Sequence, residues 1–279
     1  MNYAKGLDIK HIIINALRED IGPKDVTTES LIPKNKIAQA VLIAKEKCVV
    51  CGLDIAGLVL RLKDKNIKFK PLVKDGDALY KGRILARISG KARSILTAER
   101  VALNFLSHLS GIATGTKKFI NQVKPYRVKI MDTRKTTPGL RILEKYAVRI
   151  GGGYNHRLGL DEMVLIKDNH TKIIGKIKNL AKFKRKYKVE IEVKNLKEFR
   201  QALNLKPDII MLDNMRPSDI KKAVRIRNKL TLGSAPKLEV SGGITLNNVK
   251  KIASCGVEMI SVGALTHSVD SVDISLDLI

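Results

Sequence analysis

The fold of this chain is decided by the stretch Val128-Lys-Ile-Met-Asp-Thr-Arg-Lys-Thr-Thr-Pro-Gly-Leu-Arg141. Its first four residues form an apolar run typical of a buried strand, and the residues after it repeat with the period of a helix. Pro138 is well placed to open that helix. Arg134 and Lys135 are therefore expected on a strand-to-helix turn, where free backbone N–H groups and the positive helix end favour a multiply anionic ligand.

From Val128 onwards the same alternation of strand and helix recurs. Six apolar segments are each followed by a helical pattern, at residues 128–131, 163–166, 189–193, 209–212, 238–240 and 259–262. The residue at or near each carboxyl end is polar or glycine: Asp132, Lys167, Glu192, Asp213, Ser241 and Gly263. From Lys167 these follow one another at intervals of 21 to 28 residues, the period of a βα unit. The pattern predicts an α/β fold with a parallel barrel of TIM type, whose reacting groups lie at the carboxyl ends of the strands.

The residues before Val128 predict a separate α+β module. Helices are expected at residues 8–19, 54–62 and 94–122, strands at 38–44, 48–50, 69–73 and 84–88, and a loop at 25–33. Gly111 and Gly115 are possible points of division in the long helix. Arg100 lies off the apolar stripe of that helix and is expected to point away from the local core. The alternative is a plain surface charge or a partner in an i,i+4 pair.

Composition limits the classes of protein. The chain has 279 residues, 44% of them hydrophobic, and no apolar run long enough to span a bilayer. Residues 1–20 show an amphipathic helical pattern rather than a signal peptide, which favours the cytoplasm. Cys48, Cys51 and Cys255 are too few for a disulfide scaffold. Cys48 and Cys51 are spaced as C-x-x-C, but they are interpreted as small core residues rather than a zinc or redox site.

The formal net charge of +26 admits anionic small molecules, nucleic acid or a membrane surface as partners. The lysines are scattered, however, and only 4% of the residues are aromatic, which is few for stacking on single-stranded nucleic acid. Most of the charge is interpreted as solvated surface, with a minority gathered at a site.

Two kinds of residue at the predicted strand ends, glycines and carboxylates, indicate a binding site in the predicted barrel. Ser241-Gly-Gly and Gly263 end the last two predicted strands, where barrels often bind a phosphate on backbone amides. Glu192 and Asp213, on neighbouring strands, are expected to hold ribose hydroxyls or hydrated Mg²⁺. The alternative is that these carboxylates only pair with nearby lysines.

The same motifs resemble those of quinolinate phosphoribosyltransferase, also called carboxylating nicotinate-nucleotide pyrophosphorylase. The similarity covers nearly the whole chain, and its motifs lie at residues 99–114, 132–141, 144–148, 151–157, 165–170, 211–214 and 240–244. It implies an N-terminal α/β sandwich domain (1–112), an incomplete α/β barrel (113–268) and a C-terminal tail (269–279) that returns to the sandwich.

The resemblance also implies an activity. The family converts quinolinate and phosphoribosyl pyrophosphate into nicotinate mononucleotide, pyrophosphate and CO₂, with Mg²⁺ as cofactor, in the de novo route to NAD. It implies a homodimer, or a hexamer built of dimers, with an active site shared between subunits, and neither a specific nucleic acid nor a membrane as partner. The high lysine content departs from what this reaction requires.

Roles follow for individual residues. The two carboxylates of quinolinate are expected to meet guanidinium groups, which bind carboxylates bidentately. The implied quinolinate-binding residues are Arg100, Arg134, Lys135, His156, Arg157 and Lys167. Glu192 and Asp213 are implied to orient the ribose and, through water, the Mg²⁺. The implied catalytic set is Lys135, Lys167, Glu192 and Asp213. Ser241, Gly242, Gly243 and Gly263 complete the phosphoribosyl-binding set.

Three alternatives remain open on the sequence. A paralogue of the molybdenum-operon type, or a nicotinate phosphoribosyltransferase, would keep the scaffold and change the substrate. The pairs Arg134-Lys135 and His156-Arg157 favour quinolinate, because a monocarboxylate needs fewer cations. A nucleic-acid-binding protein is suggested by charge alone.

Overall fold

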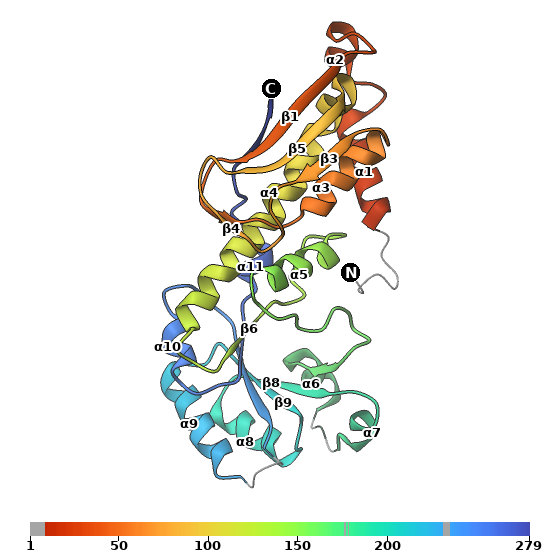
Figure 1. Ribbon diagram of the computed structural model, residues 1–279. Helices are drawn as coiled ribbons and strands as arrows, with labels where there is room; N and C mark the ends of the chain where they lie inside the picture. The colour runs from red at the N-terminus through yellow and green to blue at the C-terminus, as the bar shows by residue number, and fades with distance from the viewer. Residues whose placement is uncertain (1–8, 176, 178, 231–234) are drawn as a thin grey trace. The chain divides into compact units, whose positions relative to one another are not determined.

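A computed structural model describes residues 9–279 except 176, 178 and 231–234. The first eight residues, with which the predicted N-terminal helical pattern begins, lie outside the described part. The chain forms two compact units (Figure 1). Unit 1 takes the chain up to Lys117 together with residues 137–152 and 269–279, and unit 2 comprises residues 118–136 and 153–268. The predicted domains, divided at 112 and 268, stay predictions; the units differ in grouping residues 137–152 with unit 1.

Unit 1 is built on a four-stranded antiparallel sheet in the order β12-β1-β5-β3. Its strands are β1 (Ile37–Ala44), β3 (Lys68–Pro71), β5 (Ile84–Lys91) and β12 (Ile274–Leu278), and β2 (Cys48–Val49) pairs with β4 (Ala78–Leu79) in a separate ribbon. The helices are α1 (Ile9–Ile21), α2 (Val26–Leu31), α3 (Leu53–Lys63), α4 (Ala92–Val123), which continues into unit 2, and α5 (Arg141–Ile150). Strand β12 pairs with β1 over Ala40↔Leu278 to Ala44↔Ile274, so the end of the described chain returns to the sheet of unit 1. The three cysteines are free and buried, which confirms Cys48 and Cys51 as core residues.

Two expectations about helix starts were wrong. Residues 25–33 were predicted as a loop, but they contain α2, because the Asp25 carboxylate accepts the backbone N–H of Thr28 at 2.9 Å and caps the first turn. Pro138 does not open the helix after the basic turn, since α5 begins at Arg141. The buried Glu144 carboxylate instead accepts the backbone N–H of Thr137 at 3.2 Å and contacts His108 Nε2 at 2.9 Å, which ties this segment to unit 1.

The long helix α4 runs unbroken through both glycines that were considered as points of division. The apolar stripe predicted along it, from Ala98 to Ile112, is buried. Gly111 serves a close approach: a Cβ at this position would overlap the carbonyl oxygen of Asp270 in the tail that leads to β12. A Cβ at Gly115 would meet nothing within 4 Å.

The two glycines therefore make a matched pair for a stability measurement. Gly111→Ala is expected to lower the free energy of unfolding by about 1–3 kcal/mol, because the added methyl forces the tail away from the helix. Gly115→Ala is expected to raise it by about 0.5–1 kcal/mol, since alanine favours the helix and has room. Denaturant unfolding followed by circular dichroism measures both. Equal changes in the two variants would contradict the role given to the tail contact.

Unit 2 is built on a parallel sheet of six strands in the order β6-β11-β10-β9-β8-β7. Its strands are β6 (Lys129–Met131), β7 (Val164–Ile166), β8 (Val189–Val193), β9 (Ile209–Asp213), β10 (Lys237–Ser241) and β11 (Met259–Ser261). The helices between them are α6 (Asp168–Ile174), α7 (Ala181–Lys184), α8 (Leu196–Asn204), α9 (Pro217–Asn228), α10 (Val249–Ala253) and α11 (Ala264–His267). The predicted repeat of strands and helices is thereby confirmed. The sheet is open between β6 and β7, and a bridge of Met131 with Tyr154 extends it beyond β6.

Parallel pairing places the carboxyl ends of the six strands at one edge. The register joins Ser241 to Asp213 and Glu192 to Met211, so the polar strand ends foreseen in the sequence lie side by side. Apolar residues of the strands, such as Ile130, Val189, Ile210 and Leu238, are fully buried beneath them. Among the described residues, no helix has the length and apolar character needed to cross a bilayer.

Candidate active site

A cavity of about 840 Å³, here called the mouth cavity, lies at the carboxyl ends of the strands of unit 2. Every site residue that the sequence analysis placed in the predicted barrel domain (113–268) lines it. These are Arg134, Lys135, His156, Arg157, Lys167, Glu192, Asp213, Ser241, Gly242, Gly243 and Gly263. Arg100 belongs to unit 1, where it lies on α4 with 63% of its side chain exposed. The structure thus brings together residues from the carboxyl ends of all six strands of the sheet and from the loop that carries His156 and Arg157.

Arg134 and Lys135 follow β6 on a compact turn. The turn is held locally, because the backbone N–H of Lys135 donates to the Thr133 hydroxyl at 3.0 Å and the Thr266 hydroxyl donates to the Lys135 carbonyl at 2.7 Å. The side chain of Lys135 is exposed in the cavity, and Arg134 is half-buried. The ligand-facing cations are therefore positioned by the loop itself and not by the start of α5, which lies several residues later in unit 1.

An ion pair joins two neighbouring strand ends that line the cavity. Lys167 Nζ lies 2.9 Å from Glu192 Oε2, with 46% of the lysine side chain exposed and 9% of the glutamate. Asp213, at the end of the adjacent β9, accepts an N–H from the side chain of Asn214 at 3.0 Å. The pairing of Glu192 with a lysine matches the structural alternative foreseen for it. Both carboxylates nevertheless line the cavity, where hard oxygen ligands of this kind suit Mg²⁺.

The glycines at the ends of β10 and β11 are required by their surroundings. Gly242 and Gly243 have φ angles of +90° and +59°, in the left-handed region that favours glycine. A Cβ at Gly242 would overlap the side chain of Asn214, and a Cβ at Gly263 would crowd His267 and the Lys135 side chain. Consequently no side chain of these glycines covers the backbone on this side of the cavity. A site that binds a phosphate through backbone N–H groups requires such an uncovered backbone.

His156 uses both of its ring nitrogens within the protein. The backbone N–H of Arg157 donates to Nδ1 at 2.9 Å, so the ring carries its proton on Nε2. Nε2 donates to Glu190 Oε2 at 3.1 Å and lies 3.5 Å from Glu239 Oε1. The main chain at His156 is fixed as well, because its N–H donates to the buried Asp132 carboxylate at 2.8 Å.

The guanidinium of Arg157 is anchored by its Nη1, which donates to the Met163 carbonyl at 2.9 Å. Burial lowers the pKa of Arg157, and the nearby charge of Arg134 lowers it further. Two guanidinium groups that repel each other in one cavity are stabilised by an anion placed between them. The pair therefore fits a ligand with carboxylate groups.

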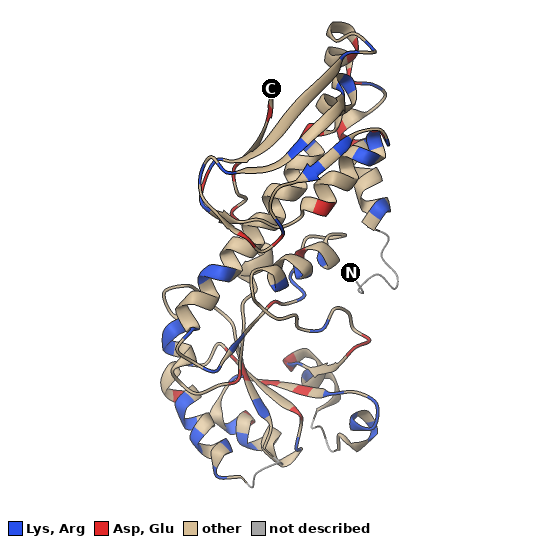
Figure 2. Cartoon of the chain, in the orientation of Figure 1, with Lys and Arg blue, Asp and Glu red and all other residues tan. Residues whose placement is uncertain are grey.

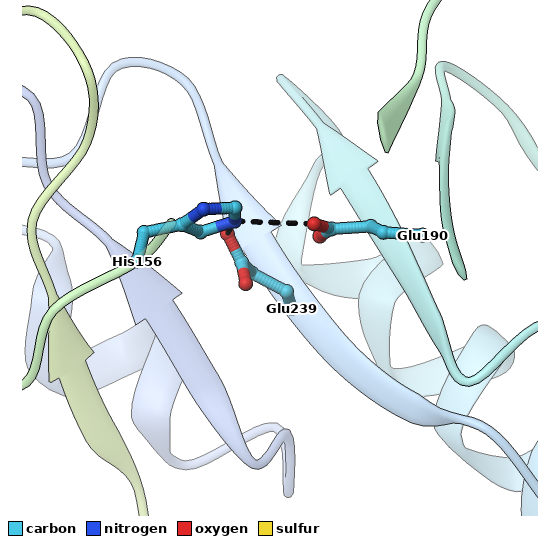
Figure 3. A group of neighbouring side chains, drawn as sticks. All are labelled: His156, Glu190 and Glu239. Atoms are coloured by element: carbon cyan, nitrogen blue, oxygen red, sulfur yellow. Dashed lines mark hydrogen bonds and ion pairs between the residues drawn. The ribbon is translucent and has the colours of Figure 1, made fainter. Parts of the chain in front are cut away.

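Two acidic residues beneath the mouth were not foreseen in the sequence. Glu190 and Glu239 are 0% and 1% exposed, and together with His156 they form a buried cluster (Figure 3). One possible ligand atom from each of the three lies within 4.8 Å of the others. The signal was available: each glutamate occupies an interior position of an apolar strand, two residues before the polar residue at the strand end. Because side chains alternate along a strand, Glu190 shares the face of Glu192, and Glu239 that of Ser241.

The charge of the chain does not concentrate at this site alone. Figure 2 shows Lys and Arg distributed over the helices and loops of both units. Many of these side chains are exposed, as the rows of lysines on α8 to α10 and their loops illustrate. The interpretation of most of the excess as solvated surface agrees with this distribution.

Comparison with protein families identifies matches along most of the chain. Residues 25–110 match the family described as quinolinate phosphoribosyl transferase, N-terminal domain, and residues 112–277 match its C-terminal domain.

Similar proteins of nearly the same length carry one name. The chain is 47% identical over 276 residues to a probable nicotinate-nucleotide pyrophosphorylase [carboxylating] of Methanocaldococcus jannaschii, with 96% of each chain covered. It is 41% identical to the protein of that name from Bacillus subtilis, over 98% of this chain and 94% of the other. Among solved structures, the nicotinate-nucleotide pyrophosphorylase from Francisella tularensis superposes with a TM-score of 0.90 at 40% identity, covering 97% of this chain and 96% of that one.

Proposed function

The chain belongs to the quinolinate phosphoribosyltransferase family, and from this premise we propose which of its residues carry out the reaction. The protein transfers the phosphoribosyl group of phosphoribosyl pyrophosphate to quinolinate and releases pyrophosphate and CO₂, forming nicotinate mononucleotide. The observation that supports the assignment of roles is the mouth cavity, which combines cations, two carboxylates and a bare glycine backbone at one edge of a sheet.

Quinolinate is held by the cations of the mouth cavity. Its two carboxylates meet Arg134 and Arg157, while Lys135 and Lys167 act as point charges toward quinolinate or the leaving pyrophosphate. His156 contributes by fixing the main chain of Arg157 through Nδ1, because both its ring nitrogens already have partners in the protein. The pyridine nitrogen is thereby presented to the anomeric carbon, and catalysis depends mainly on positioning and electrostatics.

The phosphoribosyl group is held by residues at the carboxyl ends of β8 to β11. Ser241, Gly242, Gly243 and Gly263 receive the 5′-phosphate on backbone N–H groups. Glu192 and Asp213 orient the ribose hydroxyls and would hold Mg²⁺. The donor set fits the ion, since both groups are carboxylates on adjacent strand ends, with Lys167 as the competing partner of one of them. When bound, Mg²⁺ supplies charge neutralisation to the pyrophosphate.

A homodimer completes the site in this proposal. Arg100 is largely exposed, and its nearest carboxylate is that of its sequence neighbour Glu99, at 4.0 Å. The guanidinium is therefore available to a ligand outside its own helix, and we assign it to the mouth cavity of a second copy of the chain. Whether dimers assemble further into hexamers does not alter this role.

One assay tests the activity. The protein is incubated with Mg²⁺, phosphoribosyl pyrophosphate and quinolinate carrying ¹⁴C in its C2 carboxylate. Nicotinate mononucleotide, pyrophosphate and ¹⁴CO₂ are expected in equal amounts. Absence of nicotinate mononucleotide from a folded preparation would contradict the function.

The carboxylates of Glu192 and Asp213 are expected to contribute to the binding of phosphoribosyl pyrophosphate and not to that of quinolinate. Asp213→Asn and Glu192→Gln should each lower kcat/KM for phosphoribosyl pyrophosphate by roughly 10–100-fold and raise the Mg²⁺ concentration needed for half-maximal rate. The affinity for quinolinate alone, measured by titration calorimetry, should change little. Asp219→Asn is the control, because this half-buried carboxylate on α9 pairs only with Lys222 among the described residues. Collapse of quinolinate affinity in the variants would show that the two roles are exchanged.

A further inference from the structure

Three side chains of unit 2 line two cavities at once. His156, Arg157 and Glu239 line the mouth cavity and also a second cavity of about 680 Å³. Residues at or just before the strand starts line the second cavity, among them Lys129, Lys188, Asp208 and Lys237, and it is here called the amino-end cavity. The three shared side chains therefore form the partition between the two cavities.

Glu239 is the acid of this partition. Its side chain is 1% exposed, its Oε1 accepts the Ser261 hydroxyl at 2.5 Å, and its Oε2 is buried without a hydrogen-bond partner among the described residues. An ionised carboxylate held in this way loses its hydration and gains one short hydrogen bond in return. Such a group is more stable with a proton on the oxygen that has no donor.

The groups that face Glu239 also favour its protonated form. Glu190 reaches it from β8 and Asp132 from the end of β6, and both are fully buried carboxyls. Burial raises the pKa of Glu239 to about 8, the charge of Glu190 raises it as well, and His156 and the Ser261 hydroxyl partly oppose the shift. An acid of this kind retains its proton at neutral pH in contact with two cavities.

A divalent metal ion is a poor alternative occupant of the cluster. His156 would bind an ion through Nε2, the nitrogen that faces both carboxylates, and would then carry its proton on Nδ1. Nδ1 already accepts the backbone N–H of Arg157, and two hydrogens cannot occupy that contact. The hydrogen-bond pattern therefore places a proton, and not a metal ion, between His156 and the two glutamates.

The reaction needs one proton that neither substrate supplies. Loss of CO₂ from C2 of the pyridinium leaves an electron pair on that carbon, and nicotinate mononucleotide carries a hydrogen there. We propose that Glu239 is the proton donor to C2, recharged from water in the amino-end cavity; the proposal rests on the function assigned above. The C2–carboxylate bond breaks and CO₂ departs, then the Glu239 O–H bond breaks as the electron pair on C2 takes the proton. The glutamate left as a carboxylate regains a proton from water on its other side.

Glu239→Gln tests the donor, because it keeps the shape and neutral charge of the acid but has no proton to give. Rapid-quench measurements on this variant are expected to show a burst of about one pyrophosphate per site, because phosphoribosyl transfer precedes the step that needs the proton. Formation of nicotinate mononucleotide should fall by on the order of 10²–10⁴-fold, the usual contribution of a positioned acid. Wild-type rates of product formation, or an equal loss of the pyrophosphate burst and of product, would overturn the proposal.

Glu190→Gln provides a second test, in which Glu239 itself is kept. In the wild type, kcat should decline above pH of about 8 as Glu239 ionises. Removing the neighbouring negative charge lowers the pKa of Glu239, so this decline should begin at lower pH in Glu190→Gln, while Glu239→Gln should lack it. An unchanged alkaline limb in Glu190→Gln would overturn the proposal.

Stability should change in the opposite direction to activity. The pKa of Glu239 is higher in the folded state than its ordinary value of 4.5, so its contribution to the free energy of unfolding is complete below pH 4.5 and is lost as pH rises to about 8. Glu239→Gln removes this loss and should melt at or above the wild-type temperature at pH 8. A variant that is less stable and less active in proportion would indicate a structural role only. Failure of the wild type itself to release pyrophosphate from phosphoribosyl pyrophosphate in the presence of quinolinate would count against the function and not against the donor.

Discussion

Quinolinate is expected to be used with a kcat/KM on the order of 10⁴ times that for nicotinate. Nicotinate lacks the C2 carboxylate, and a site built to bind a charged or hydrogen-bonding group rejects an analogue without it by about 10⁴–10⁵. The physical reason is visible in the mouth cavity, where Arg134, Lys135 and Arg157 come from two loops of one unit. When nicotinate binds, the cations that would meet the C2 carboxylate still repel one another and have no anionic partner.

The measurement compares initial rates for the two acids with saturating phosphoribosyl pyrophosphate and Mg²⁺. Arg134→Ala serves as the matched variant, because it should lower the rate with quinolinate far more than the rate with nicotinate. Comparable kcat/KM values for the two acids in the wild-type protein would contradict the assignment of the cluster to a dicarboxylate.

Arg100→Ala and Lys167→Ala are each expected to be nearly inactive, and a heterodimer of the two is expected to regain activity at one site in two. Loss of a charge contact in a closed site costs about 2–5 kcal/mol, which lowers kcat/KM by on the order of 10²–10³. If Arg100 acts in the partner's cavity, one site of the mixed dimer combines an intact Lys167 with an intact Arg100 of the partner subunit. The other site carries both substitutions.

Co-expression with two different affinity tags and sequential purification yields the mixed dimer. Arg87→Ala is the control, since Arg87 is another exposed arginine of unit 1, on β5. A purified heterodimer as inactive as either parent would place the action of Arg100 within its own chain, or show that it has none.

Much of unit 2 could be predicted from the sequence because parallel strands share one direction. Once Lys167, Glu192 and Asp213 were recognised as strand ends at a regular interval, their meeting at one edge followed from the topology. A polar residue at the end of an apolar run was enough to predict this part of the site, and no knowledge of distant contacts was needed.

Features that depend on distant segments could not be predicted in this way. Gly111 was interpreted as a possible break in α4, whereas its purpose is set by Asp270, far along the chain. The helix α5 is grouped with unit 1, where the Tyr146 hydroxyl donates to Asp75 at 2.7 Å, and its place in the sequence does not indicate this contact. The burial of Glu239 required knowledge of which strand face lines the barrel.

The pairing of β12 with β1 has a consequence for how the protein is made. Strand β1 needs neighbours on both sides, and one of them is separated from it in the sequence by the whole of unit 2. During synthesis, β1 therefore emerges with an open edge, which is a template for pairing with other chains. Unit 2 has nearly all its residues in one run and can form its sheet first. Pairing of β12 with β1, which completes the sheet of unit 1, should then be the slow, late event in folding. Until then the open edge of β1 is the part of the chain that chaperones need to protect from aggregation.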